Sequence, residues 1–93
     1  MPSPVKYRED VYFTGHVQGV GFRYTALQVA KEYEVSGVVS NLPDGRVRLL
    51  TEGELSEVQA FVAAVEERMH GHIRKTERRV VTGGAPLNGF VIG

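Results

Sequence analysis

The chain has 93 residues, of which 42% are hydrophobic and 24% charged, and these values indicate a single globular domain over residues 1–93. Eleven Lys and Arg balance eleven Asp and Glu, so no excess of positive charge indicates a surface for nucleic acid or for an anionic membrane. The lack of Cys excludes disulfides, cysteine nucleophiles and thiolate metal sites, and no apolar run approaches the roughly 20 residues of a membrane span.

The first predicted strand covers residues 5–14, which are rich in Val, Tyr, Phe and Thr. Alternation places Val11 and Phe13 on one face of it. The first four residues include two prolines, and we expect them to lie outside the fold. After a glycine-rich stretch, an apolar helical face predicts a helix from Phe22 to about Glu34. The residues of this face are Phe22, Ala26, Val29, Ala30 and Tyr33.

A β-hairpin is predicted next, with strands at residues 35–42 and 46–52. The turn between them is Pro43-Asp44-Gly45, in which proline pre-sets φ and glycine accepts a positive φ. Alternation along the second strand puts three residues on one face. They are Val47, Leu49 and Thr51.

A second amphipathic helix is predicted from Leu55 to Met69. Its apolar positions are Leu55, Val58, Phe61, Val62, Val65 and Met69. Residues 73–82 combine charged and β-branched side chains, which favours an edge strand where charge discourages aggregation. Residues 90–92 predict a short final strand.

The order β-α-β-β-α-β with a terminal strand predicts an α+β fold, the ferredoxin-like split β-α-β sandwich. We expect an antiparallel sheet of four to five strands with both helices on one face. The two strands around the first helix should be parallel, which brings the loop after the first strand near the end of the second.

The loop between the first strand and the first helix is Gly15-His16-Val17-Gln18-Gly19-Val20-Gly21-Phe22-Arg23. Its glycines expose N–H groups, the helix N-terminus adds partial positive charge, and Arg23 adds a full charge. The loop has neither the Gly-Lys-Ser/Thr ending of a Walker loop nor the glycine spacing of a dinucleotide loop. These features indicate a site for a phosphoryl group; a turn that only joins strand to helix is the alternative.

This loop closely resembles the first signature of the acylphosphatases. Gly37-Val38-Val39-Ser40-Asn41 looks like their second signature, Gly-x-Val-x-Asn, and Pro43-Asp44-Gly45 follows as in that family. The resemblance runs from about Val11 to Met69. The C-terminal part departs from the family, because the fourth strand is unusually charged and no Arg-Tyr or aromatic tail is present.

The resemblance implies a metal-independent, cofactor-free enzyme that hydrolyses the carboxyl-phosphate bond of small acyl phosphates. Family substrates include acetyl phosphate, carbamoyl phosphate and 1,3-bisphosphoglycerate, and phosphate or sulfate is the expected site ligand. By the same resemblance, Arg23 binds the phosphate and Asn41 positions the water. The implied phosphate-binding loop comprises Gly15, His16, Val17, Gln18, Gly19 and Val20.

The histidines and the charged run indicate no separate site. We expect the main-chain N–H of His16 to matter more than its imidazole, and we expect His70 and His72 to be a surface pair without a third metal ligand. The charged run at residues 74–79 indicates a solvated edge strand rather than an RNA site, since it lacks interleaved aromatics. Whether Tyr24 lines the site stays open.

Three other functions remain as alternatives. One is a non-catalytic module that binds phosphate-bearing metabolites, and another is a carbamoyl-phosphate-handling domain like that at the start of hydrogenase-maturation carbamoyltransferases, against which the short chain argues. RNA binding is the third alternative and the one that the sequence supports least. We expect a cytoplasmic monomer that binds neither nucleic acid nor membrane.

Overall fold

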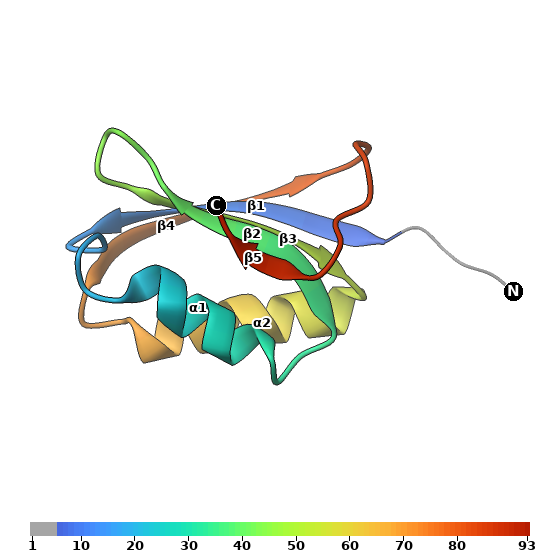
Figure 1. Cartoon of the computed structure of the whole chain (residues 1–93), viewed down its shortest axis with the longest axis horizontal. Helices are drawn as coiled ribbons and strands as arrows, with labels where there is room; N and C mark the ends of the chain where they lie inside the picture. Colours follow the sequence, from blue (N-terminus) through green and yellow to red (C-terminus); the bar gives the residue numbers. More distant parts are fainter. Residues whose placement is uncertain (1–5) are drawn as a thin grey trace, which may run out of the picture.

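Both helices cover one face of a five-stranded sheet in the computed structural model, which describes residues 6–93 (Figure 1). The expectation for residues 1–4, and the start of the first predicted strand at residue 5, lie outside the described residues. The elements are β1 (Tyr7–Gly15), α1 (Phe22–Ala30), β2 (Val35–Asn41), β3 (Val47–Gly53), α2 (Leu55–Arg68), β4 (Ile73–Val81) and β5 (Phe90–Ile92).

The strands lie in the order β4-β1-β3-β2-β5. β3 lies between β1 and β2 and is antiparallel to both, so β1 and β2 run in the same direction. This confirms the predicted α+β fold. β5 joins the sheet parallel to β2, so the sheet is mixed and not wholly antiparallel as expected. β4 pairs with β1 at the opposite edge, as predicted.

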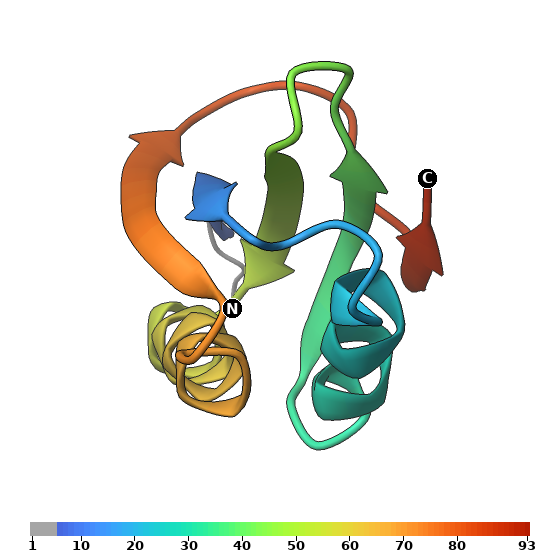
Figure 2. The same cartoon turned by 90° about the vertical axis from the view of Figure 1, so that its left-hand side faces the viewer.

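Strand register brings the ends of β1 and β2 to the same end of the sheet. Phe13 of β1 and Asn41 of β2 both pair with Val47 of β3, so these three residues form one row across the sheet. Gly15 ends β1 two positions after this row. The loop that leaves β1 and the hairpin turn that leaves β2 therefore meet at this end, which faces the viewer in Figure 2.

The core lies between the sheet and the helices, with the predicted strand faces turned inward. Val11, Phe13, Val47 and Leu49 are fully buried. The predicted faces of both helices contribute Phe22, Ala26, Val29, Ala30, Val58, Phe61, Val62, Val65 and Met69. Leu55 is the exception: it starts α2 ahead of the first core position and is 51% exposed.

α1 ends at Ala30, four residues before the predicted Glu34. The amides of Lys31, Glu32 and Tyr33 donate to carbonyls three residues back, which tightens the chain beyond the α-helical pattern. Tyr33 still packs on Phe61, with ring centroids 6.2 Å apart. The apolar periodicity therefore located its side chain correctly although the helix had already ended.

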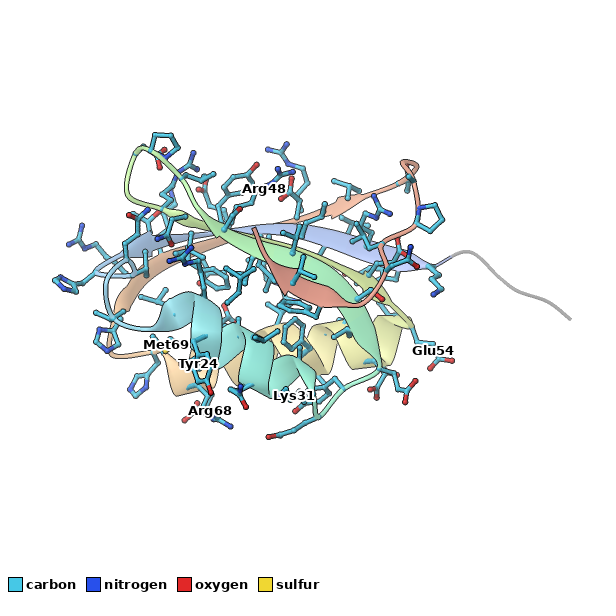
Figure 3. The ribbon with its side chains drawn as sticks, in the orientation of Figure 1. Tyr24, Lys31, Arg48, Glu54, Arg68 and Met69 are labelled. Atoms are coloured by element: carbon cyan, nitrogen blue, oxygen red, sulfur yellow. The ribbon has the colours of Figure 1, made fainter. Side chains whose placement is uncertain are left out.

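Acidic side chains of β1 are buried and paired with arginines of its neighbours. Glu9 is only 2% exposed, and Arg78 of β4 donates to both of its carboxylate oxygens at 2.8 Å. Asp10 accepts two hydrogen bonds from Arg48 of β3, which rises from the sheet face away from the helices (Figure 3). The charged run of β4 is exposed at the sheet edge, as predicted, and Arg78 in addition pairs with a buried carboxylate.

Neither helix within residues 6–93 combines the length and apolar character that a membrane-spanning helix requires.

Candidate functional site

A cavity of about 210 Å³ lies where the glycine-rich loop, the first turn of α1 and the end of β2 converge. Its lining residues are Val17, Gly19, Gly21, Phe22, Arg23, Tyr24, Asn41 and Ile92. Arg23 and Asn41, which the sequence predicts as the catalytic pair, thus share one cavity. Gly15, His16, Gln18 and Val20 of the predicted loop do not line it.

Gly15 starts the loop with a break in the β-ladder. The register between β1 and β4 shifts between Thr14 and Gly15. Gly15 has φ +139°, and an added Cβ would lie 2.5 Å from the carbonyl oxygen of His72. A side chain therefore cannot be accommodated without moving the backbone of the strand beside it.

His16 is held by the residue that immediately precedes β4. Its main-chain N–H donates to the carbonyl of His72 at 2.9 Å. This donor is engaged within the protein, unlike the N–H groups of the residues that follow it in the loop. The His16 side chain is exposed, as expected.

The rest of the loop presents N–H groups that have no acceptor within residues 6–93; these belong to Val17, Gln18, Gly19 and Val20. Gly19 and Gly21 have φ +78° and +77°, a conformation that favours glycine. Gly21 is the N-cap of α1 and provides no side-chain cap, so the first amides of the helix also lack a side-chain acceptor there. Together these groups form a surface of N–H donors without acceptors among residues 6–93.

Two side chains fix the loop. Val17 is only 1% exposed and belongs to the hydrophobic core. The side-chain amide of Gln18 donates to the carbonyls of Leu42 and Arg46, at 2.8 and 3.0 Å. Sequence reasoning missed this role for the Gln18 side chain, since no local pattern relates the loop to a turn more than twenty residues later.

Asn41 is the last residue of β2 and is exposed toward the cavity that it lines. Tyr24 also lines the cavity and is 62% exposed, which answers the question left open by the sequence. It projects from α1 on the helical side of the molecule (Figure 3). The cavity therefore offers one amide, one guanidinium and the aromatic residues Phe22 and Tyr24 beside the backbone donors.

The cavity has a cationic character. Among its lining residues within the described chain, Arg23 alone carries a formal charge. The nearby hairpin acid, Asp44, accepts a backbone hydrogen bond from Arg46 at 3.0 Å and pairs with the Arg46 side chain at 2.8 Å. These contacts lower the pKa of the Asp44 carboxyl, the backbone hydrogen bond being the largest cause. An anionic ligand therefore meets Arg23 without a carboxylate lining the same cavity.

The histidines do not assemble a metal site in the described chain. Among residues 6–93, no three His, Cys, Asp or Glu side chains are grouped so that they could hold an ion. His70 and His72 are both exposed. The rings of His16 and His72 are 6.3 Å apart between centroids. His70 and His72 thus lie at the surface, and the ring of His16 is the neighbour of the ring of His72.

Comparisons with known proteins agree with this geometry. A family model described as Acylphosphatase matches residues 9–92. The acylphosphatase of Listeria welshimeri is 48% identical over 74 residues, which are 80% of this chain and 78% of that protein. The acylphosphatase of Archaeoglobus fulgidus is 47% identical over 57 residues, which are 61% of this chain and 64% of that protein. The crystal structure of acylphosphatase from Bacillus subtilis superimposes with a TM-score of 0.83 at 29% identity, covering 94% of this chain and 98% of that one.

Proposed function

The chain belongs to the acylphosphatase family, and from this premise we propose how the residues around the glycine-rich loop act on an acyl phosphate. The reaction is hydrolysis of the carboxyl-phosphate bond, which yields a carboxylate and inorganic phosphate. Metal-independent turnover of small acyl phosphates is part of the proposal. The observation that carries it is the single cavity shared by Arg23, Asn41 and the loop.

The phosphoryl group binds to the loop and to Arg23. The N–H groups from Val17 to Val20, together with those of the first turn of α1, donate to phosphoryl oxygens, and the helix N-terminus adds partial positive charge. Arg23 pairs with the same oxygens and stabilises the charge that develops on them during transfer. Phosphoryl transfer depends mainly on such positioning and charge stabilisation.

Asn41 holds the attacking water in line with the bond that breaks. Its amide oxygen accepts a hydrogen bond from the water, and its NH₂ group can donate to a phosphoryl oxygen. The water oxygen bonds to phosphorus while the bond from phosphorus to the acyl oxygen breaks, and its electron pair leaves on the carboxylate. The carboxylate needs no proton, since its conjugate acid has a pKa of about 4. The water proton passes to the phosphate or to solvent, because an amide is not a base.

The physiological setting is also part of the proposal. We infer a monomer that works in the cytoplasm, where a chain without Cys has no need of an oxidising compartment. Its partner is the acyl phosphate, and phosphate or sulfate occupies the site as product or as mimic. Neither nucleic acid nor membrane is a partner.

Hydrolysis of benzoyl phosphate in the presence of excess chelator tests the proposal. Wild type should turn over the substrate, and Arg23→Ala should lower kcat/KM about a thousandfold or more, as other phosphoryl-stabilising arginines do. Asn41→Ala should mainly lower kcat. Arg68→Ala is the control, since Arg68 is exposed at the end of α2 and should leave the rate unchanged.

Two results would contradict this assignment. A folded wild type that binds phosphate without turnover would be a non-catalytic module. An Asn41→Ala enzyme altered only in KM would exclude the water-positioning role.

A further inference from the structure

The Gln18 side chain connects the anion-binding loop to the hairpin that carries Asn41. Its NH₂ group has two hydrogens, and the carbonyls of Leu42 and Arg46 accept one each, at 2.8 and 3.0 Å. Within residues 6–93, no other hydrogen bond joins the loop of residues 15–21 to the hairpin segment of residues 41–47. Gln18 is thus the polar link between the two halves of the site.

The two carbonyls that Gln18 contacts lie where the hairpin closes. Leu42 donates its own N–H to the carbonyl of Arg46 at 2.8 Å, and its carbonyl accepts the N–H of Gly45 at 3.1 Å. Leu42 follows Asn41 directly in the chain. A contact with Leu42 and Arg46 therefore holds the backbone of the turn that begins immediately after Asn41.

The opposite side of the loop is fixed by packing. Val17, the neighbour of Gln18, is buried in the core. The backbone at residues 17 and 18 is thereby held from one side by the core and from the other by the hairpin. The position of the loop N–H groups relative to Asn41 depends on both contacts.

We propose that Gln18 is a positioning residue, whose side-chain amide sets the distance between the anion-binding N–H groups and Asn41. This inference rests on the proposed function, since it assumes that the loop binds the phosphoryl group and that Asn41 holds the water. The Gln18 side chain acts through the hairpin carbonyls and does not itself contact the reacting atoms, whereas the main-chain N–H of Gln18 belongs to the anion-binding donors. Because a displacement of about 1 Å can cost about a hundredfold in rate, losing this link should affect turnover more than binding.

Gln18→Met tests the inference, because methionine is unbranched and of similar length but cannot donate hydrogen bonds. With benzoyl phosphate we expect kcat to fall by about tenfold to a hundredfold. The inhibition constant of inorganic phosphate should change far less, since the loop N–H groups and Arg23 remain. Gln28→Met is the matched control: Gln28 lies on α1, and within residues 6–93 its side chain makes no hydrogen bond. It should leave kcat unchanged.

A double-mutant cycle with Asn41→Ala separates positioning from a general structural role. If Gln18 acts through Asn41, Gln18→Met should lower kcat little further once Asn41 is alanine. An equal loss in both backgrounds would overturn the inference while leaving the proposed function intact. If instead Asn41→Ala alone leaves kcat unchanged, the proposed role of Asn41 fails first.

Gln18→Glu provides a second measurement that does not depend on the methionine variant folding. An ionised carboxylate cannot donate to the two carbonyls and is repelled by them, whereas a protonated carboxyl regains one donor. The ratio of variant kcat to wild-type kcat should therefore rise as the pH falls from 7 toward 5, approaching the ordinary Glu pKa of about 4.3. A ratio that stays constant over this range would overturn the inference, and urea unfolding checks that each variant is folded.

Discussion

At the scale of single residues, the site depends on backbone conformation as much as on side chains. Gly19 has φ +78°, and an added Cβ would meet nothing within 4 Å. Its requirement for glycine is therefore conformational rather than steric. A residue with a Cβ is destabilised by about 1–2 kcal/mol at such a positive φ. If the backbone relaxed to a negative φ, the neighbouring N–H groups would change direction relative to the cavity.

Gly19→Ala should therefore lower both stability and activity. We expect a loss of about 1 kcal/mol in the free energy of unfolding. We also expect kcat/KM for benzoyl phosphate to fall about tenfold or more, since a single misplaced oxyanion donor costs about 10²–10³ in rate. Urea unfolding and a steady-state assay measure the two effects.

Gly83→Ala is the matched control for Gly19→Ala. Gly83 has φ +81°, and its Cβ would also meet nothing within 4 Å, but it lies in the connection between β4 and β5. The Gly83→Ala substitution should lower the free energy of unfolding by a similar amount and leave kcat/KM unchanged. Equal activity losses in both variants would mean that the loop conformation of Gly19 has no special role in binding.

At the scale of elements, β1 is held between its neighbours by charge as well as by its backbone ladder. Burial by itself would raise the pKa of the Glu9 carboxyl, but hydrogen bonds from Arg78 and Tyr7 outweigh it, so the pKa of Glu9 is lowered. The pKa of Glu52 is likewise lowered against its burial, by Arg8 and by the amide of Leu87. The carboxylate form is thus the one that the folded sheet stabilises.

This balance predicts how stability depends on pH. Because the pKa of both carboxyls is lower in the folded protein, the unfolded chain binds more protons as the solution becomes acidic. The free energy of unfolding should therefore be nearly constant from pH 7 to 5.5 and should fall as the pH drops through about 4, the ordinary range of a Glu carboxyl. Urea titrations across this range measure it, and stability that rises toward acid pH would contradict the sign.

Removing one partner tests the ion pair directly. Arg78→Met should cost about 2–3 kcal/mol at pH 7, less than the roughly 3–5 kcal/mol of a fully buried pair, because the Arg78 side chain keeps 33% of its surface exposed. Arg79→Met is the control on the same strand, since Arg79 is exposed and takes part in no ion pair within residues 6–93. A similar loss in both variants would show that charge in β4, not the contact with Glu9, is responsible.

At the scale of the whole molecule, the site exists only when the sheet is assembled. Its parts come from the loop after β1, the first turn of α1, the end of β2 and the C-terminal strand β5, and β3 sets the spacing of β1 and β2. A ligand of the cavity therefore binds the folded chain and not the unfolded one. Binding and global stability are linked for this reason.

Inorganic phosphate should raise the melting temperature, and the gain should keep growing with the logarithm of the phosphate concentration once this exceeds its Kd. At a hundred times its Kd the gain in unfolding free energy is about 2.7 kcal/mol. Sulfate should act in the same way, and chloride at equal ionic strength should not. Thermal unfolding with increasing phosphate measures the effect.

Two variants locate this stabilisation. Arg23→Ala should abolish most of the shift in melting temperature, and Arg68→Ala should retain it. A shift that survives in Arg23→Ala would place the bound anion elsewhere on the molecule.

Much of the fold follows from local patterns, since a strand and a helix each repeat their buried positions with a fixed period. Val11 and Phe13 on β1, and Phe22 and Ala26 on α1, are buried because alternation and helical spacing face them to the core. The glycines of the loop and Arg23 predicted an anion site from residue chemistry, whereas the role of Asn41 was implied by the resemblance to the acylphosphatase signatures. Both roles stay predictions. The cavity that unites Arg23 with Asn41 agrees with that interpretation.

The tertiary structure alone decided the contacts between distant segments. The parallel pairing of β5, the burial of Glu9 against Arg78 and the hydrogen bond that engages the N–H of His16 each join residues with no shared local pattern. The Gln18 amide is the clearest case, since its acceptors are carbonyls that any residue type could supply. A sequence names side chains and their periodicity; which backbone groups meet across the fold depends on strand order and register, and these emerge only when the sheet is assembled.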